Sequence, residues 1–249
     1  TNTPVGPTST PTNTPVGPTN TPTSTPVSGA DLIFADSFES GNFSAWTASK
    51  VDTNDLSVTA AAALAGHAAR QYVRYGASPR GMQALINDSN TLYVTDDTPN
   101  AEPRYRARFY FDPNTIAMAN NDAHIMFYGY TGTSTTMLRI EFRSSSGAYQ
   151  LRAGLKNDAD AWLSTNYVTI SDAPHAIEFD WRAATAAGAN DGGLTFWIDG
   201  VQQGNLTGVD NDLARVDRAR LGPANSIDAG TRGTYYFDSI ADFNAGRAN

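Results

Sequence analysis

Apolar and polar side chains alternate along several segments of the chain, and this alternation limits the fold more than any other feature of the sequence. The clearest segments span residues 104–111, 138–143, 177–182 and 194–199. Successive side chains of a β-strand point to opposite faces of a sheet. Each segment therefore predicts a strand with one buried and one solvent-facing side, which is typical of antiparallel sheets.

Turn sequences separate these segments. Asp199-Gly200 lies between LTFWI and VQQ and predicts a type I′ hairpin, and Ser146-Gly147 and Asn190–Gly193 are further turn signals. The alanine-rich stretch at residues 60–65 is the best candidate for a helix, although it is short and Gly66 ends it. We therefore expect an all-β, antiparallel two-sheet sandwich of roughly a dozen short strands.

The first 28 residues have a different composition from the rest of the chain. TNTPVGPTSTP is followed by TNTPVGPTNTP and by the start of a third copy, which gives an 11-residue period that holds seven of the 13 prolines. Proline excludes a helix here and favours an extended polyproline II conformation. The sequence thus predicts a Thr/Pro-rich tail or linker at residues 1–28 and a folded domain at residues 29–249.

Two interpretations of the tail remain open. It is either a stalk, with O-glycans on its threonines, or an arm that docks on copies of the same chain and builds a filament. Val5, Val16 and Val27 supply one sizeable apolar side chain per repeat. In polyproline II, one repeat spans roughly 34 Å, so each valine could meet the same groove on a successive subunit.

Charge and composition exclude several classes of function. The chain has 17 basic and 25 acidic residues, a net charge of −8, and no cysteine. The acidic balance argues against a nucleic-acid partner, and no apolar run is long enough to span a membrane. The chain begins at Thr1 without a methionine or signal peptide, which indicates a processed or excised piece of an extracellular or cell-surface protein.

Four segments, in order along the chain, resemble bacterial concanavalin A-like and laminin G-like jelly-roll modules. They are FADSFESGNFSAW (34–46), HAIEFDWRAA (175–184), DGGLTFWIDG (191–200) and GTYYFDSIADF (233–243). The resemblance covers about residues 31–243 and implies that the predicted sandwich is a jelly roll. It implies little about function, because this fold hosts lectins, glycosidases, adhesion modules and structural proteins.

Acidic residues do not form a recognisable catalytic pair. Glycosidases of this fold carry closely spaced acids on one strand, whereas the four glutamates here are far apart. Glu178 and Asp180 share a strand face, where they are expected to pair with arginines. His175 begins a strand and is expected to make a structural hydrogen bond. The sequence therefore predicts that the chain is not an enzyme.

The resemblance also implies a structural calcium ion between the first and last strands. Glu39 and Asp238 match the two acidic positions, with Asp36 as a weaker third. The alternative is that Glu39 caps turn amides and that Asp238 pairs with an arginine. The acidic loops at residues 157–160 and 210–212 are interpreted as solvated.

A carbohydrate ligand is the remaining candidate partner. If the alternating strands are neighbours, their outward side chains form one polar sheet with aromatic platforms, as in many sugar-binding sandwiches. The candidate residues are Trp197, Tyr110, Arg139, Glu178 and Arg182. We thus expect a non-catalytic structural or cell-surface protein, with a carbohydrate-binding or adhesion module as the alternative.

Overall fold

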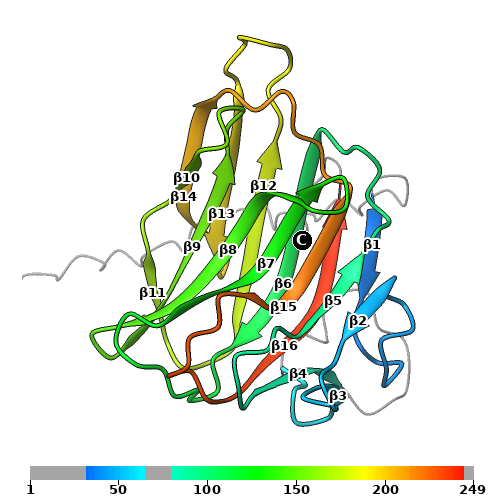
Figure 1. Cartoon of the computed structure of the whole chain (residues 1–249), viewed down its shortest axis with the longest axis vertical. Coiled ribbons are helices and arrows are strands. Elements are labelled where there is room, and N and C mark those ends of the chain that lie inside the picture. Colours follow the sequence, from blue (N-terminus) through cyan, green and yellow to red (C-terminus); the bar gives the residue numbers. More distant parts are fainter. Residues whose placement is uncertain (1–31, 65–79, 244–249) are drawn as a thin grey trace, which may run out of the picture.

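The computed structural model describes residues 32–64 and 80–243, which form an antiparallel β-sandwich (Figure 1). The boundary between residues 28 and 29 and the three tail valines lie outside these ranges, so the predictions about them stay predictions. Within the described ranges all regular structure is β-strand, and no helix there could cross a membrane. The all-β prediction is confirmed, with 16 strands instead of roughly a dozen.

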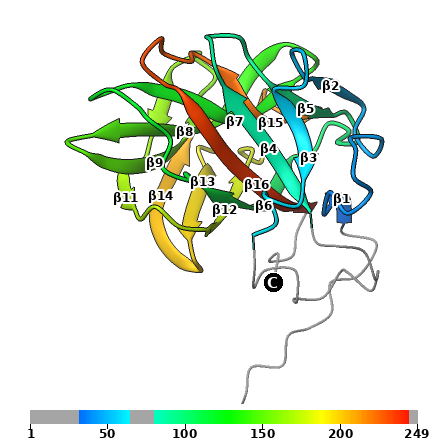
Figure 2. The same cartoon turned by 90° about the horizontal axis from the view of Figure 1, so that it is seen from below.

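Each of the two sheets contains eight strands. Sheet 1 has the order β14 (Val201–Val209), β13 (Gly192–Ile198), β12 (His175–Arg182), β6 (Arg104–Asp112), β16 (Gly233–Phe243), β4 (Gly81–Ile86) and β3 (Leu56–Thr59), with β1 (Leu32–Asp36) paired to β16. Sheet 2 has the order β10 (Trp162–Ser164), β9 (Ala148–Lys156), β8 (Thr135–Ser145), β7 (Ala123–Thr131), β15 (Arg218–Asn225), β5 (Tyr93–Asp96) and β2 (Ala48–Lys50), with β11 (Val168–Ile170) paired to β9. Figure 2 shows them as two layers, with β7 and β15 in one and β6, β12 and β16 in the other.

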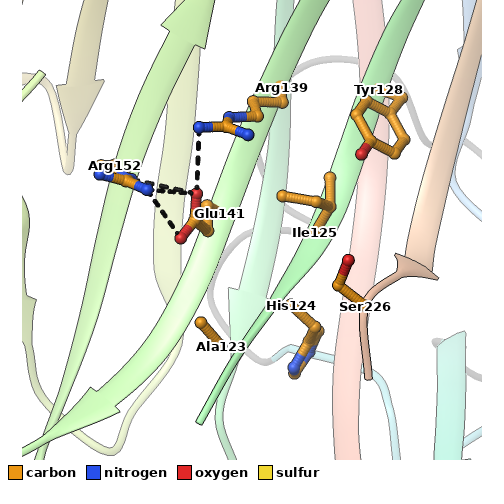
Figure 3. A pocket seen from close by; sticks show the side chains of 8 residues that line it. All are labelled: Ala123, His124, Ile125, Tyr128, Arg139, Glu141, Arg152 and Ser226. Carbon is orange, nitrogen blue, oxygen red and sulfur yellow. Dashed lines mark hydrogen bonds and ion pairs between the residues drawn. The ribbon is translucent and has the colours of Figure 1, made fainter. Parts of the chain in front are cut away.

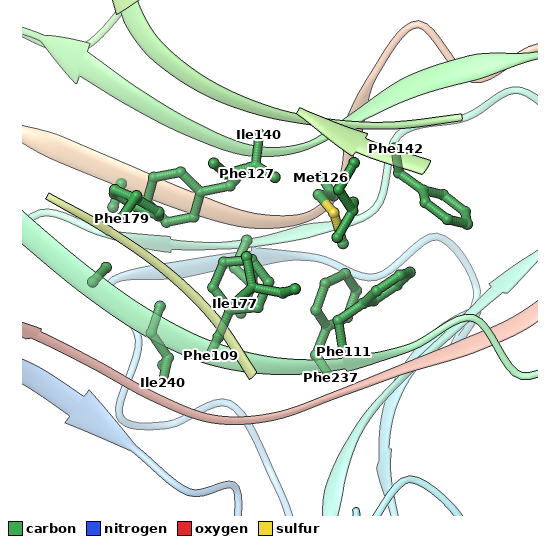
Figure 4. Close-up of a cluster of buried hydrophobic side chains, with 14 of the residues drawn as sticks. Phe109, Phe111, Met126, Phe127, Ile140, Phe142, Ile177, Phe179, Phe237 and Ile240 are labelled. Atoms are coloured by element: carbon green, nitrogen blue, oxygen red, sulfur yellow. The ribbon is translucent and has the colours of Figure 1, made fainter. Parts of the chain in front are cut away.

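The core fills the space between the two layers (Figure 4). Phe127 and Phe142 approach it from sheet 2, and Phe109, Phe111 and Phe179 approach it from sheet 1. All five side chains are fully buried. The prediction of one buried side for each strand is therefore confirmed, because the apolar residues of each strand face the opposite sheet.

Two of the three predicted turns, including the predicted type I′ turn at Asp199-Gly200, are type I′ hairpins, whereas Gly192 and Gly193 of the third signal already lie in β13. Asp199 and Gly200 have φ angles of 53° and 78° between β13 and β14, and Ser146 and Gly147 have φ angles of 53° and 77° between β8 and β9. A type I′ turn needs a positive φ at both central residues, which Gly and Asp tolerate.

The predicted helix at residues 60–65 is wrong for its described part. Residues 60–64 contain a turn, in which Ala63 N–H donates to the Ala60 carbonyl over 3.2 Å. The chain passes so close to β4 that a Cβ atom on Gly81 would lie 2.1 Å from the Ala62 carbonyl oxygen. Leu64 N–H then donates to Asp238 over 3.1 Å. These tertiary contacts outweigh a weak local helix propensity.

Candidate functional site

The outer face of sheet 2 is rich in arginine and aromatic side chains, and we call it the basic face. Glu141 is the one acidic residue of the sheet 2 strands that faces outward, since Asp96 is buried opposite the core residue Ala219. The outward-facing residues that define the face are Arg139, Arg143, Arg152, Lys156, Arg218 and Arg220, with Tyr93, Tyr128, Tyr130, Trp162 and Tyr167 beside them. The face is thus positively charged on a chain with a net charge of −8.

Glu141 lies at the centre of this face, accepts hydrogen bonds from two side chains and forms a longer ion pair with a third. Arg152, directly across on β9, donates to both of its oxygens over 2.8–3.0 Å. Arg139 Nη2 lies 3.6 Å away, and the Tyr167 hydroxyl donates to the same carboxylate. Burial and the neighbouring Glu141 raise the pKa of Tyr167 to about 12, so its hydroxyl keeps its proton. One carboxylate therefore orients two arginines and neutralises only one.

Aromatic rings hold the guanidinium groups without neutralising them. The Arg143 guanidinium carbon lies 3.4 Å from the centre of the Tyr167 ring, and that of Arg220 lies 4.4 Å from the Tyr93 ring. Cation–π stacking of this kind fixes the plane of the charge and leaves its edge donors available. Of the carboxylates that the structure describes, none lies within ion-pair distance of Arg143 or Arg220.

A glycine makes room for one of these stacks. Gly154 lies directly opposite Arg139, and a Cβ atom there would come within 3.4 Å of Arg139 Nε and 2.8 Å of Ser164 Oγ. Because that Cβ is absent, the Arg139 side chain reaches Trp162 on β10, at 4.2 Å from the ring centre.

A cavity of about 230 Å³ opens on the basic face (Figure 3). Tyr128 on β7 lies directly opposite Arg139 on β8, and Asn225 donates to the Tyr128 hydroxyl over 3.2 Å. Figure 3 shows Arg139, Arg152 and Glu141 on one side of the cavity and Tyr128 and Ser226 on the other. The cavity thus brings two guanidinium groups and a phenol together.

His124 lines the inner end of this cavity but belongs to the core. Its ring stacks on Tyr235 with the centres 5.7 Å apart, and Nε2 lies 3.1 Å from the Tyr235 hydroxyl. Complete burial lowers the pKa of His124 to about 4, so the ring is neutral at pH 7. His124 therefore lines the cavity as an uncharged side chain.

Four of the five predicted carbohydrate-binding residues lie on the other sheet. Tyr110, Glu178, Arg182 and Trp197 share the outer face of sheet 1, where β6, β12 and β13 are neighbours as expected. Arg139 is on β8 of sheet 2, so the predicted single surface does not exist. The sequence could not show this, because alternation gives the face of each strand but not its sheet.

The outer face of sheet 1 is a network of ion pairs. Glu178 accepts from Arg106 over 2.9 and 3.0 Å, and Asp180 accepts two hydrogen bonds from Arg104 over 2.7 and 2.9 Å. The predicted arginine pairing of Glu178 and Asp180 is thus confirmed. Arg106 also lies 5.2 Å above the Trp197 ring.

The predicted calcium ligands Glu39 and Asp238 come close together. Glu39 accepts from the Arg80 backbone N–H over 3.1 Å through one oxygen, and its other oxygen is buried without a partner among the described residues. Burial, together with the charge of Glu39, raises the pKa of Asp238 to about 6. Asp36 instead accepts from Trp46 Nε1 over 2.7 Å and from Phe38 N–H over 3.0 Å. Both Asp238 oxygens also accept hydrogen bonds, from Leu64 N–H and from the Ser239 hydroxyl over 3.1 Å each. Of these three acids, Glu39 therefore has the one carboxylate oxygen without a partner among the described residues.

The sequence analysis missed most of the residues that line the cavity. Arg152 was missed although Gln150, Arg152 and Lys156 alternate with apolar residues, which is the signal used for the other strands. Tyr128 and Tyr167 carry no such signal, because β7 is buried on nearly every residue and Tyr167 lies in a loop. Trp162 was also missed, and it lies on edge strand β10 with its ring under Arg139.

The acidic loops predicted to be solvated meet at one point. One carboxylate oxygen each from Asp158, Asp210 and Asp212 lie within 4.8 Å of one another, and the first two residues are exposed. Asp158 N–H donates to the Asp210 carbonyl over 2.9 Å, so backbone pairing brings the loops together.

Comparison with known proteins identifies the fold and no closer relationship. No family model and no curated protein matches the sequence. Among solved structures, the T. cruzi calreticulin globular domain matches with a TM-score of 0.56 at 10% identity, covering 86% of this chain and 88% of that one. The endo-β-1,4-glucuronan lyase of the fungus Trichoderma reesei matches with a TM-score of 0.53 at 14% identity, over 86% and 96%. Domain 4 of the Geobacillus stearothermophilus arabinanase AbnA, solved with arabinotriose, matches with a TM-score of 0.50 at 11% identity, over 86% and 93%.

These likenesses confirm the jelly-roll sandwich expected from the resemblance, and they correct one prediction. The chain was expected not to be an enzyme, because no paired acids were found in the sequence. A polysaccharide lyase has the same fold over 86% of this chain, so that expectation is withdrawn. The acid-pair criterion tested for glycosidases, whereas a lyase needs no such pair.

Proposed function

We propose that this chain binds an acidic polysaccharide, with carboxylates on its sugar rings, across the basic face. The observation that carries the proposal is the charge of this face. Its strands turn six basic side chains outward, of which Arg218 pairs with Asp97 and Lys156 with Asp160. The other four, Arg139, Arg143, Arg152 and Arg220, share the face with Glu141 alone, on a chain with a net charge of −8. Guanidinium groups pair with carboxylates through two parallel hydrogen bonds, which favours uronic acids over neutral sugars.

The cavity supplies the central contact in this proposal. Arg139 and Arg152 would bind one sugar carboxylate, while the ring packs against Tyr128. Their side chains are 19% and 28% exposed, so they can be reached from solvent. Glu141 and the aromatic stacks hold the arginines in place beforehand, which lowers the entropy lost on binding.

The likenesses support this proposal only at the level of the fold. One of the matching structures is named for a lyase of glucuronan and another was solved with arabinotriose. A polyuronate such as glucuronan is therefore the first ligand to test.

The test is titration calorimetry of the full chain with polyglucuronate and with neutral arabinan. We expect binding of polyglucuronate alone, and a loss of at least about tenfold in affinity in Arg139→Gln and Arg152→Gln, since each removes a charged hydrogen-bond donor. Arg182→Gln, an exposed arginine on sheet 1, is the matched control and should bind as wild type does. Equal binding of the neutral glycan, or unchanged affinity in both variants, would rule the proposal out.

Cleavage of the bound polysaccharide by β-elimination is a second candidate function. The observation that favours it is the Tyr128 hydroxyl, which lies in the cavity beside Arg139. The arginines would stabilise the negative charge as Glu141, which lines the same cavity, takes the proton next to the sugar carboxylate. The C4–O bond then breaks, a C4=C5 double bond forms, and Tyr128 donates a proton to the leaving oxygen. Tyr128→Phe should abolish the ultraviolet absorbance of an unsaturated product and keep polyglucuronate binding.

A structural calcium ion at Glu39 and Asp238 is a separate part of the proposal. The partnerless oxygen of Glu39 and the raised pKa of Asp238 support this proposal, because a cation would balance their buried negative charge. Calcium prefers such carboxylate oxygens, and here it would join the segment after β1 to β16. Its role would be to stabilise the sandwich, away from the basic face.

A further inference from the structure

Three polar side chains at one end of the sandwich form a continuous hydrogen-bonded chain that the basic face does not use. Ser171 directly follows β11, His175 begins β12, and Asp199 is the first residue of the β13–β14 turn. Ser171 Oγ lies 2.9 Å from His175 Nε2, and His175 Nδ1 lies 2.7 Å from Asp199 Oδ2. These are the contacts of a nucleophile, a general base and the carboxylate that orients the base.

Asp199 is held firmly enough to orient the imidazole. Its Oδ1 accepts from Ala176 N–H over 2.8 Å, and its own N–H donates to the Ala176 carbonyl over 2.8 Å. A carboxylate can only accept, so the proton of the neutral His175 ring is on Nδ1. The lone pair of Nε2 therefore faces the Ser171 hydroxyl.

A second hydrogen-bond acceptor and two carboxylates lie near the His175 ring. The Ser171 carbonyl oxygen lies 3.2 Å from Nε2 and can accept from it once that nitrogen carries a proton. The Asp199 carboxylate lies 2.7 Å from Nδ1 and would stabilise a positive charge on the ring, and the Asp112 carboxylate also interacts with the ring electrostatically.

Ser171 is accessible and precedes unused hydrogen-bond donors. The residue is exposed, whereas the His175 side chain is 12% exposed. Among the described residues, none accepts a hydrogen bond from the backbone N–H of Asp172 or Ala173. The N–H that follows a nucleophilic serine is a common oxyanion donor in acyl transfer.

We propose that Ser171, His175 and Asp199 form a nucleophilic triad that hydrolyses esters of small acyl groups. Ser171 Oγ attacks the ester carbonyl carbon while its proton moves to His175 Nε2. The carbon–oxygen bond to the alcohol breaks as that proton passes to the leaving oxygen, and an acyl-serine remains. Water, deprotonated by His175, then releases the carboxylic acid and restores the serine. The inference goes beyond carbohydrate binding and is independent of it.

A covalent probe tests the first step directly. The full chain is incubated with a fluorophosphonate, and the modified peptide is located by mass spectrometry. We expect one adduct on Ser171, none there in Ser171→Ala, and labelling slower by about 100-fold in His175→Gln, since general bases contribute at least that much. Asp199→Asn should slow labelling at least tenfold, because it removes the orienting charge.

Two controls separate this outcome from folding and from the basic face. Ser226→Ala removes an exposed serine at the polysaccharide cavity and should be labelled as wild type is. Arg152→Gln should lose polysaccharide affinity and keep the Ser171 adduct, so each proposal can fail without the other. Circular dichroism melts confirm that the variants are folded. An absent adduct on Ser171, or a rate that His175→Gln leaves unchanged, would overturn the triad and leave a structural clasp.

Discussion

The two outer faces of this sandwich are built from the same residue types and differ in how their charges are balanced. On sheet 1, Arg104 and Arg106 face two acids across the strand pair, and Arg106, Glu178 and Asp180 are all buried. On sheet 2, the arginines of β8 and β9 share the single carboxylate of Glu141, and the basic side chains there stay partly exposed. These charged side chains of sheet 1 thus pair with one another inside the fold, whereas part of the positive charge on sheet 2 is not balanced by an acid and can bind a ligand.

This difference teaches that a row of arginines on a strand is not by itself a binding site. The β6 strand carries three outward arginines and looks as basic in sequence as any strand of sheet 2. Its neighbour β12 supplies Glu178 and Asp180 at opposing positions, so two of the three arginines are neutralised by pairing. The strand beside it decides whether a basic strand can bind an anion.

The largest expected effect follows from the buried pairs of sheet 1. Arg106→Met should lower the free energy of unfolding by about 3–5 kcal/mol, because it removes the arginine that pairs with the buried carboxylate of Glu178 and the second arginine of Asp180. Arg220→Met on sheet 2, which has no such partner, should cost less than about 1 kcal/mol. Urea denaturation of both variants measures the difference. Similar losses would show that the faces do not differ in this way.

The next effect sharpens the comparison at Asp238, a buried acid of sheet 1 that forms no ion pair with an arginine among the described residues. Burial raises its pKa from 3.8 to about 6. Without calcium, the folded chain therefore binds the proton more tightly than the unfolded chain does. The stability from this group is complete below about pH 3.8 and is lost as the pH rises through about 6, which amounts to about 3 kcal/mol.

The measurement is the difference in unfolding free energy between wild type and Asp238→Asn at pH 4 and pH 7 in a chelator. His124, whose pKa is lowered to about 4, has the opposite dependence but is present in both proteins and cancels. Adding calcium at pH 7 should raise the melting temperature of wild type, and neither Asp238→Asn nor Glu39→Gln should respond. An unchanged wild-type melt with excess chelator would contradict the calcium site.

Salt should weaken ligand binding at the basic face more than it weakens the ion pairs of sheet 1, and this effect should be smaller than the two above. Raising the sodium chloride concentration from about 0.05 M to about 0.5 M screens exposed charges, so polyglucuronate affinity should fall roughly tenfold. The buried pairs of sheet 1 are screened less, so the melting temperature should change little over the same range. Calorimetry and a thermal melt on the same samples test both. A binding constant insensitive to salt would indicate recognition through ring stacking alone.

The smallest expected effect concerns Glu141, the acid of the basic face. Glu141→Gln removes the carboxylate that competes for Arg139 and Arg152, so affinity for polyglucuronate should rise about two- to fivefold, less than 1 kcal/mol. Asp180→Asn is the matched change on sheet 1 and should leave the affinity unchanged. A weaker complex in Glu141→Gln would mean that orienting the arginines matters more than the competing charge.

Much of the fold was predictable because it depends on local patterns. The alternation at residues 104–111 gives the buried face of β6, and Asp199-Gly200 gives the hairpin that ends β13. The segment at residues 60–65 shows the limit of this approach. Its alanines predict a helix, but Gly81 and Asp238, which are distant in sequence, hold the described part of it as a turn.

The candidate site was predictable only in its residue types. Arginine, tyrosine and tryptophan on outward faces were expected to bind sugars, yet the five residues chosen divide between two sheets. For the Ser171–His175–Asp199 chain, the sequence predicted only a structural hydrogen bond of His175. Asp199 could not be predicted as its partner, because it is 24 positions away and the contact depends on the hairpin.

The sequence by itself determined that this protein is an antiparallel β-sandwich, which of its side chains face the core, and where its hairpins turn. These properties follow from the two-residue period of a strand and the φ angles of its turns, and both are local. Only the tertiary structure decided which strands are neighbours, and with that which arginines are neutralised by acids. Ion pairing depends on distances of a few ångströms between residues that lie far apart along the chain, so the charge left for a ligand is a property of the assembled sheets.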